Sequence, residues 1–479
     1  MNSLLTKERK WIIVPIEAKV REFHAKLLLC CVAAEEGYGA ILGHGRIIKK
    51  KWLKLPRGIY FDKSVALVNA KRFHHHKKHG NYVAAWCEEG LLLVDKSSYQ
   101  HRRISQKTFK HVDLFFAWGK HHEDVILEKV PEVKEKLVVA GNPRIDLLSK
   151  NFRVIFNQDA EAIIKRYGDY ILINTNFSAY NHVRGKEVGL AIQKKAGKIV
   201  TDKQEVFWRR FIKFKKTMFY EFVKMVQALS ANVHNINIIV RPHPAENHVA
   251  WQDCMRGFDN VHIVHEGNVI PWIMGAKVSI HNGCTTGLEA YLLERPVISY
   301  QPPVPTVYDS YLPDVVSEQA YDLEQLIDLT IKVCDAKNIF NINARSQKDD
   351  IIRDHIQIMN GRLASDSIIR QLAQLPLIEQ KFKAKSIQQF SRSFLCMVPI
   401  IKSEVGKIKD RLVTQEKYFT KSNDNRNLYQ MQEAIFRQEF PVTKLEEVNK
   451  VIDKFKEVSG RFDSVTAIQI EKNCFAIGK

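Results

Sequence analysis

The sequence has no apolar run long enough to cross a membrane. Its longest apolar stretch, which follows Lys26 in the segment 26–34, is far shorter than the roughly 20 residues that a membrane-spanning helix needs. The first ten residues lead directly into a strand-like segment at 11–16, which is too short for the apolar core of a signal peptide. We therefore expect a cytoplasmic protein, with peripheral contact on the inner face of the cytoplasmic membrane left open.

Cysteine is sparse and scattered along the chain. The eight cysteines include one adjacent pair, Cys30 and Cys31, and no Cys-x-x-Cys spacing, so the sequence indicates neither a zinc site nor a disulfide framework. Histidine is grouped in the run at 73–79 and in the pair His121 and His122, but no carboxylate or cysteine accompanies either group at a ligand spacing. We expect no bound metal and no cofactor.

Acidic residues are too few to balance the basic ones. Lys and Arg number 73 against 53 Asp and Glu, which gives a formal net charge of +20 and favours anionic partners. The sequence contains no RNA-binding aromatic motif and no zinc finger, so nucleic acid is not expected as a partner. The anionic partners that remain are a phosphorylated sugar donor, a membrane-bound acceptor and the cytoplasmic leaflet.

Short apolar segments alternate with amphipathic ones, which is typical of βαβ units with parallel sheets. In a first series we expect helices near 22–35, 63–78 and 121–128, and strands at 11–16, 40–42, 58–60, 82–86, 114–118 and 137–140. In a second series we expect helices near 205–229 and 287–293, and strands at 170–174, 236–240, 261–264, 278–280 and 297–299. The sequence therefore predicts an α/β fold with two Rossmann-like domains.

The length of 479 residues and the hydrophobic content of 45% favour two or three domains. We predict a first Rossmann-like domain at 1–150, a helical linker at 151–168, a nucleotide-binding Rossmann-like domain at 169–321 and an extension at 322–479. The extension is expected to be helical and basic, because it mixes basic residues with acids and lacks strand-length apolar alternation. Two α/β halves of similar size favour a ligand in a cleft between them.

Residues 278–289 run from a predicted strand into a turn of small residues and then a helix. Gly283 and Gly287 would let the backbone approach a ligand, and the hydroxyls of Thr285 and Thr286 can bind phosphate beside the first free N–H groups of the helix. The alternative is a purely structural turn. The spacing also resembles a hydrolase nucleophile elbow, which we reject because only one histidine follows it, in the predicted extension.

His243 lies between Pro242 and Pro244, directly after the predicted strand at 236–240. The prolines stiffen the backbone, so the imidazole is presented at the carboxyl end of a strand, where α/β sheets bind ligands. Arg241 adds a second cation, and together the two side chains suit a leaving phosphate. The alternative is a histidine that only packs or caps.

Glu88 and Glu89 follow the predicted strand at 82–86. One of them could act as a general base or as a carboxylate nucleophile across the cleft from His243. The alternative is a solvated turn, because adjacent glutamates before a glycine are common on surfaces.

The segments Glu88-Glu89-Gly90 and His243-Pro244 resemble the acidic and His-Pro motifs of bacterial CMP-sialic acid and CMP-Kdo transferases. The chain is also similar to the bacterial family of surface carbohydrate biosynthesis proteins, in stretches at 14–22, 55–63, 139–146, 171–177, 241–244 and 281–290. Residues 141–146 resemble, in addition, the segment that closes the first domain of CDP-glycerol glycerophosphotransferases and other GT-B enzymes.

This resemblance implies a GT-B glycosyltransferase of bacterial surface polysaccharide synthesis, with a CMP-linked acidic sugar as donor and a glycan or lipid-linked glycan as acceptor. It implies that His243 aids departure of the CMP phosphate, while Glu88 or Glu89 serves the acceptor or the anomeric carbon. Such enzymes need no metal, because cations of the protein and a helix dipole take the leaving charge. The phosphate site would comprise Arg241, Pro244, Asn282, Gly283, Thr285, Thr286, Gly287 and Glu289, with Glu17, Arg21, Asn174 and Asn176 as candidate substrate contacts.

The chain departs from the resemblance in having Cys284 and threonines where serines are commoner. The sequence leaves open whether glycosyl transfer retains or inverts the configuration of the sugar. Three alternative functions also stay open: transfer of a polyol phosphate from a CDP-linked donor, 2-epimerisation of a nucleotide sugar, and a non-catalytic polybasic assembly factor at the membrane.

Overall fold

The structure is a computed structural model that describes residues 9–92, 96–185, 188–195, 199–302, 311–335, 342–358, 361–376, 378 and 440–479. By compactness the chain divides into two units. Unit 1 comprises Met1–Asp62, His75–Val83 and Ile369–Lys479, and unit 2 comprises Lys63–His74 and Ala84–Ile368. The domain boundaries expected at 150, 168 and 321 stay predictions.

The first sheet has eight strands in the order β13-β14-β2-β1-β3-β4-β5-β6. The strand β1 (Trp11–Ile16) pairs in parallel with its neighbours on both sides, and every one of its residues is buried. A continuous apolar run buried on both faces is typical of parallel sheets. The other strands from the first part of the chain are β2 (Gly39–His44), β3 (Ile59–Asp62), β4 (Tyr82–Ala85), β5 (Leu114–Ala117) and β6 (Leu137–Val139).

The helices of this part of the chain include the three that the sequence predicts, with shifted ends, and several short ones that it does not. The predicted helix at 63–78 is shorter in the structure, because helix α3 begins only at Ala70, after a 3-10 turn at Leu67–Asn69. The helices are α1 (Lys19–Glu35), α2 (Gly45–Lys51), α3 (Ala70–Lys78), α4 (Lys96–Arg103), α5 (Gln106–Phe109), α6 (Lys120–Lys129), α7 (Pro143–Asp146) and α8 (Asn157–Tyr167).

The expectation that no strand follows position 322 is wrong. Strands β13 (Thr466–Glu471) and β14 (Cys474–Gly478) form an antiparallel hairpin, and β14 pairs with β2 at the edge of the first sheet. All five residues of β14 are buried, and Asn473 in the turn has a left-handed backbone, φ 55°. Helix α21 (Leu445–Ser459) precedes the hairpin, while the part of the predicted extension at 379–439 lies outside the described residues.

The second sheet has six strands in the order β12-β11-β10-β7-β8-β9, and its strand pairs are parallel. The first, β7 (Tyr170–Asn174), matches the sequence prediction at both ends. The others are β8 (Asn237–Arg241), β9 (Val261–Ile263), β10 (Val278–His281), β11 (Val297–Tyr300) and the unpredicted β12 (Glu318–Ala320). The two sheets confirm the predicted α/β class with two largely parallel sheets.

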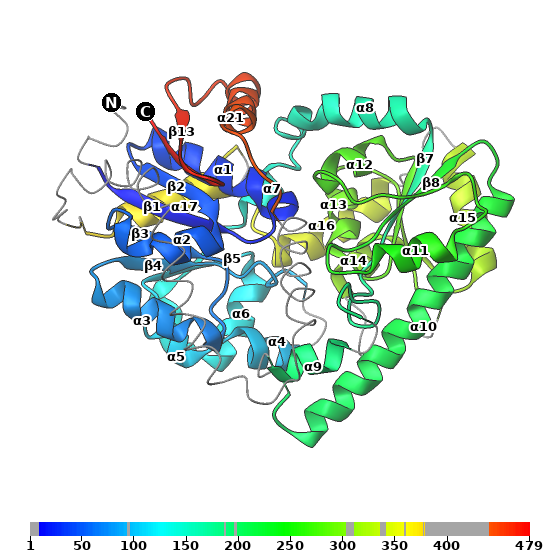
Figure 1. The fold of residues 1–479 in the computed structure, drawn as a ribbon, viewed down its shortest axis with the longest axis horizontal. Coiled ribbons are helices and arrows are strands. Elements are labelled where there is room, and N and C mark those ends of the chain that lie inside the picture. The colour runs from blue at the N-terminus through cyan, green and yellow to red at the C-terminus, as the bar shows by residue number, and fades with distance from the viewer. Residues whose placement is uncertain are drawn as a thin grey trace, which may run out of the picture. The chain divides into compact units, whose positions relative to one another are not determined.

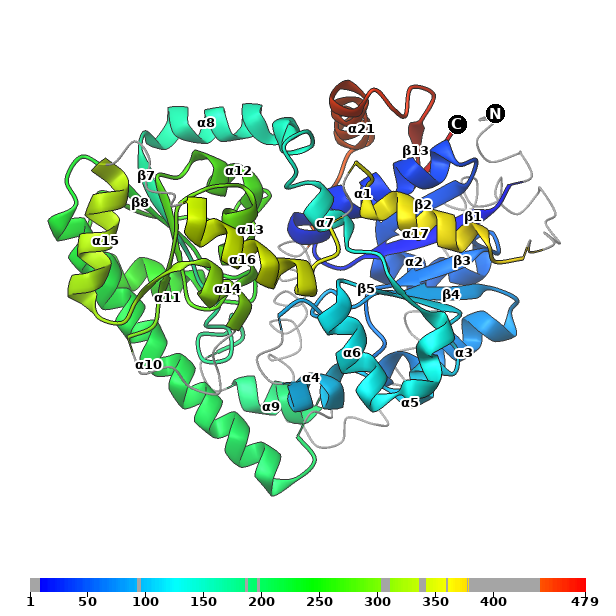
Figure 2. The ribbon, with the colours of Figure 1, turned by 180° about the vertical axis from the view of Figure 1, so that it is seen from behind.

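Helices cover both faces of the second sheet (Figures 1 and 2). The long α10 (Asp202–Asn232), α11 (His248–Cys254) and α15 (Leu323–Asp335) close the main core on one face. On the other face α12 (Val269–Gly275) packs against α8 and β7, beside α13 (Thr285–Leu292). The remaining helices are α9 (Val188–Lys195), α14 (Tyr311–Val316), α16 (Ile342–His355) and α17 (Ala364–Ala373).

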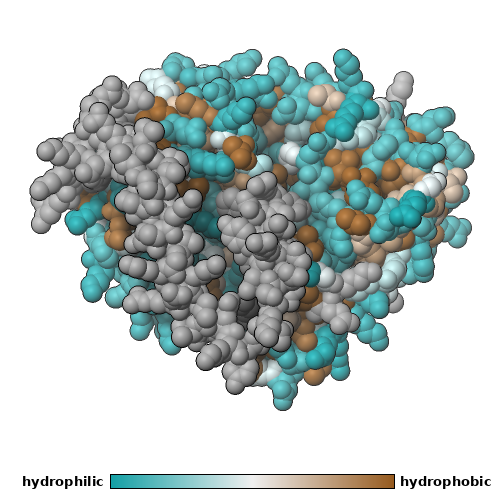
Figure 3. Space-filling model, viewed as in Figure 1, coloured by the Kyte–Doolittle hydropathy of each residue, from teal (hydrophilic) through white to brown (hydrophobic). Residues whose placement is uncertain are grey.

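The surface of the described residues is mostly hydrophilic on the face that Figure 3 shows, with hydrophobic residues scattered among the polar ones. Such scattered apolar residues are ordinary on protein surfaces. Among the described residues, every helix is too short or too polar to span a bilayer.

Candidate functional site

The loop after β8 carries His243 and is held by one buried carboxylate, that of Glu246. The Oε1 atom of Glu246 accepts hydrogen bonds from the hydroxyl of Thr175 (2.8 Å) and from the backbone N–H groups of Phe177 (2.9 Å) and His243 (3.2 Å). Its Oε2 atom accepts one from the indole N–H of Trp251 (3.0 Å). Burial raises the pKa of Glu246, and these four donors oppose that shift by stabilising the charged form.

His243 is half-buried, and the same loop orients its ring. Its Nδ1 atom accepts a hydrogen bond from the backbone N–H of Ala245 at 3.1 Å, so the neutral imidazole carries its proton on Nε2. Pro242 and Pro244 flank His243 in the sequence. An Nε2–H group is the donor that a leaving phosphate oxygen would need.

Arg241, expected as a second cation beside His243, is bound elsewhere. Its guanidinium donates to the backbone carbonyls of Glu266 (2.7 Å) and Gly267 (3.2 Å) and lies 5.1 Å from the ring centre of Trp272. Burial lowers the pKa of Arg241 to about 10. The side chain therefore anchors the turn at 266–267, which corrects the expectation that it is available to a phosphate.

The turn between β10 and α13 has the shape that the sequence predicts. Gly283 adopts a left-handed backbone, φ 64°, which a glycine adopts without strain, and α13 begins at Thr285. Gly287 has a different role from the one expected, because a Cβ there would overlap the ring of His281. His281 is fully buried and hydrogen-bonds the hydroxyl of Ser317 at 2.8 Å, so Gly287 makes room for this ring rather than for a ligand.

Three buried polar atoms near this turn and the end of β7 have no hydrogen-bond partner among the described residues. They are Oδ1 of Asn282, Oγ1 of Thr286 and Nδ2 of Asn174. Buried polar atoms in proteins are almost always hydrogen-bonded to protein groups or to ordered water, so these three atoms at a strand end are positioned to bind water or a polar ligand. All three residues belong to the predicted site.

A cavity of about 340 Å³ lies beside these elements. It brings together four of the predicted residues: His243, Asn282, Gly283 and Asn176. The others that line it are Arg102, Ser178, Ala179, His182, Gly189, Ile192, Gln193, Trp208, Phe211, Ile212, Lys215 and Ala245. Two motifs that are far apart in the sequence thus share one hollow in unit 2.

Lys215 of α10 is a buried cation at this cavity that the sequence analysis missed. Its Nζ atom donates to Oδ1 of Asn176 at 2.7 Å, and the amide of Asn176 donates to the carbonyl of Asn282 at 3.5 Å. The side chain is 7% exposed, and its charge lies 5.8 Å from the ring centre of Phe211. The signal was present, because Lys215 falls on the apolar stripe of α10 with Phe211, Met218 and Phe222 at helical spacing.

Aromatic side chains form another part of the cavity wall. The rings of Trp208 and Phe211 meet edge to face with centres 5.5 Å apart, and the guanidinium of Arg102 lies 5.8 Å from the centre of the Trp208 ring. Flat apolar surface beside cations suits a base or a sugar that carries phosphate.

The two predicted acids Glu88 and Glu89 differ in their surroundings. Glu88 is 7% exposed and accepts the indole N–H of Trp86 at 2.9 Å, whereas the side chain of Glu89 is 49% exposed and lies 3.8 Å from Arg103. A cation lies between Glu88 and a second acid, since Arg144 reaches Glu88 at 3.9 Å and Glu289 at 2.6 Å. Glu289 therefore pairs with an arginine in the described structure.

Arg144 is a further residue to which sequence reasoning gave no role. It lies on the short helix α7, where Asn142 caps the helix by accepting the N–H of Arg144 and Pro143 occupies the first turn. Gly141, φ 76°, starts this segment. The Asn-Pro pair after a glycine is a helix-start signal that could have located both the helix and its arginine.

The remaining expected contacts, Glu17 and Arg21, lie in unit 1, after β1 and in α1. The backbone N–H of Glu17 donates to the carboxylate of Glu22, which also forms a buried ion pair with Lys26 at 2.6 Å. Their part in substrate binding stays a prediction.

No profile of a known protein family matches the chain, and no curated protein matches its sequence. Among solved structures, the UDP-GlcNAc 2-epimerase from Methanocaldococcus jannaschii is 12% identical with a TM-score of 0.47, over 76% of this chain and 99% of that one. The 2-epimerase from Neisseria meningitidis bound to UDP-GlcNAc is 12% identical with a TM-score of 0.45, over 76% of this chain and 100% of that one. A variant of the wall teichoic acid polymerase TagF is 10% identical with a TM-score of 0.49, over 77% and 89%. Similarity at this level does not decide a reaction.

Proposed function

We propose that this chain is a glycosyltransferase of bacterial surface polysaccharide synthesis that transfers an acidic sugar from a CMP-linked donor to a glycan acceptor. One observation carries the proposal: the cavity combines a buried lysine, the His243 ring and the Asn282–Gly283 turn with an aromatic wall. This combination provides cationic and apolar surface together, as a nucleotide sugar requires. The choice of CMP and of an acidic sugar depends on the motifs Glu88-Glu89-Gly90 and His243-Pro244.

The leaving phosphate would bind between Lys215, His243 and the turn before α13. Negative charge grows on that phosphate as the glycosidic bond breaks, and preorganised donors at the position of growing charge lower the barrier. The ammonium of Lys215 supplies a fixed charge at a buried position, and Nε2–H of His243 supplies a directed donor. The N-terminus of α13, which is the positive end of the helix dipole, and the hydroxyl of Thr286 would add further donors to the phosphate.

We assign the acceptor side to Glu88 rather than to Glu89. It is buried and held by Trp86 and Arg144, whereas Glu89 is half exposed. A carboxylate fixed in this way can take the proton of an acceptor hydroxyl. Arg144 would orient it and share its charge with Glu289.

Nucleotide binding tests the donor class directly. We expect CMP or CDP to raise the melting temperature of the purified chain more than UMP or UDP does, since a ligand at 100 times its Kd stabilises the folded state by about 2.7 kcal/mol. Lys215→Met keeps the aliphatic stem among the phenylalanine rings and removes the charge, so we expect CMP to bind about 10-fold more weakly or worse. Lys213→Met, at an exposed position of the same helix, is the matched control. Preference for UDP would contradict the CMP donor.

Turnover tests the reaction. We expect release of CMP from a CMP-linked acidic sugar only when a glycan acceptor is present, and we expect His243→Ala to lower the rate about 100-fold or more with little change in melting temperature. The control is His234→Ala, at an exposed position after α10. A 2-epimerase would act without an acceptor, and normal surface glycan in cells that carry His243→Ala would support the non-catalytic assembly factor instead.

A further inference from the structure

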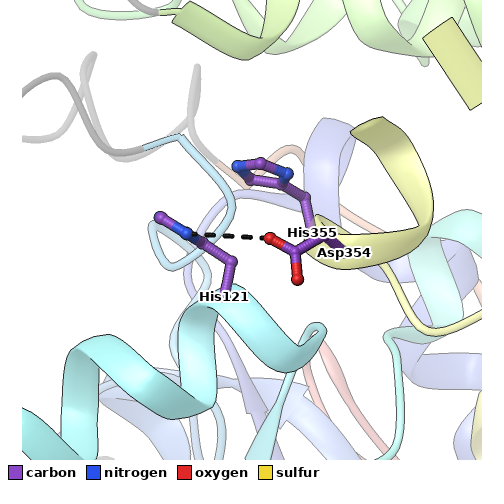
Figure 4. A group of neighbouring side chains, drawn as sticks. All are labelled: His121, Asp354 and His355. Carbon is purple, nitrogen blue, oxygen red and sulfur yellow. Dashed lines mark ion pairs between the residues drawn. The ribbon is translucent and has the colours of Figure 1, made fainter. Parts of the chain in front are cut away.

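Three potential metal ligands meet outside the cavity, where α6 begins and α16 ends (Figure 4). They are His121 of α6 and the adjacent Asp354 and His355 of α16, and one ligand atom from each lies within 4.8 Å of the others. Nδ1 of His121 lies 3.9 Å from a carboxylate oxygen of Asp354, and the two imidazole rings have their centres 4.4 Å apart. All three residues belong to unit 2.

The backbone keeps these helix ends together without help from the three side chains. Gly119, just before α6, approaches α16 so closely that a Cβ would overlap the carbonyl group of His355. Beyond α16, the N–H of Gln357 donates to the carbonyl of Trp118 at 2.7 Å. The site is therefore built on fixed backbone, which is what a preorganised metal site requires.

His355 is oriented as metal-binding histidines usually are. Its Nδ1 atom donates to the backbone carbonyl of Ile351 at 2.9 Å, which fixes the tautomer and leaves the lone pair of Nε2 for a metal. Tetrahedral zinc with bonds of about 2.0–2.2 Å places its ligand atoms roughly 3.4 Å apart. The two rings are stacked at present, so metal binding requires the side chains of His121 and Asp354, which are 39% and 54% exposed, to rotate toward Nε2 of His355.

We propose that His121, Asp354 and His355 form a binding site for a divalent transition metal of the zinc type, which ties the end of α16 to the start of α6. Two imidazoles and one carboxylate suit Zn²⁺ and neighbouring first-row ions rather than Mg²⁺ or Ca²⁺, which prefer oxygen ligands. Three protein ligands would leave a fourth position for water. This departs from the expectation of no metal, because ligands at positions 121 and 354 have no spacing that a sequence motif can show.

The test is a titration of the full chain, freed of metal by a chelator, with Co²⁺ followed by its visible absorption and then with Zn²⁺ as competitor. We expect one equivalent of Co²⁺ to bind and Zn²⁺ to displace it. His355→Gln and Asp354→Asn should each weaken binding by about 10-fold or more. His75→Gln, in the histidine run on α3, is the matched control and should bind as the unchanged chain does.

Zn²⁺ should also raise the melting temperature of the unchanged chain and of His75→Gln more than that of Asp354→Asn. Asp354 is exposed, so its replacement by asparagine is expected to leave folding intact, and circular dichroism checks this. The proposal is overturned if the unchanged chain binds no Co²⁺ or Zn²⁺ at 100 μM ion, or if Asp354→Asn and His355→Gln bind as tightly as His75→Gln does.

Discussion

Replacing Glu246 with glutamine should loosen the loop that carries His243. In the structure one carboxylate oxygen receives three donors and the other receives only the indole N–H of Trp251. The side-chain amide of glutamine has one oxygen and one NH2 group in place of the two carboxylate oxygens. The orientation that costs less places the oxygen where the three donors converge. The NH2 group then faces the indole N–H of Trp251, so that two hydrogen-bond donors oppose each other.

The cost can be worked out from that geometry. The Trp251 N–H loses its acceptor and the new amide finds none, and each unsatisfied group costs about 1–3 kcal/mol. Removing a buried negative charge returns part of this cost, since burial raises the pKa of Glu246. We expect a net loss of about 2 kcal/mol in the free energy of unfolding. We also expect a larger effect on turnover than on nucleotide binding, because a neutral amide oxygen holds the backbone N–H of His243 more weakly than a carboxylate does.

The assay is a double-mutant cycle with Trp251→Phe, measured by urea unfolding followed by circular dichroism. Phenylalanine removes the indole N–H, so Glu246→Gln meets no opposing donor in that background. The two changes together should therefore cost less than their sum by at least about 1 kcal/mol. Additivity to within about 0.5 kcal/mol would refute the assignment of Glu246 as the acceptor that organises this loop.

Two other perturbations have expected outcomes. Gly287→Ala should destabilise the fold by about 1–3 kcal/mol, more than the gain in helix propensity, because the new Cβ would overlap the His281 ring. Adding His281→Ala should restore part of the lost stability. If Gly287→Ala unfolds at the same urea concentration as the unchanged chain, this packing is contradicted. Burial raises the pKa of Asp146 from its ordinary value of 3.8 to about 7, so the stability that its protonated form provides is complete below about pH 4 and is lost as the pH rises through 7. Asp146→Asn should flatten the fall in melting temperature between pH 4 and 7, and an unchanged slope would show that other groups cause it.

The strands were the part of the fold that sequence reasoning predicted best. Strand β7 agrees at both ends, and β8 is shifted by one residue at each end. These strands are mostly apolar and buried on both faces, so the few residues of each strand are enough to predict it from the sequence. The hairpin β13–β14 was missed because its alternation is short and follows a long charged region.

The sequence predicted the residues of the candidate site only where a motif lies at the end of a strand. His243, Asn282 and Gly283 line the cavity as their positions at strand ends suggest. Arg241 was assigned by its charge and Glu289 by its place in the motif, and neither reveals that other groups already bind the side chain. Glu246 joins three segments of the chain, which only tertiary structure brings together.

The hairpin that pairs with β2 bears on how the chain is made. Glu35, just before β2, accepts a hydrogen bond from Arg461 at a separation of 426 positions. At roughly 5–20 residues per second, a ribosome needs about 20–90 s to synthesise that stretch. For all of that time the outer edge of β2 presents unpaired backbone groups, the kind of edge that recruits other strands. An uncovered edge of this kind would favour aggregation of the nascent chain until β14 is made.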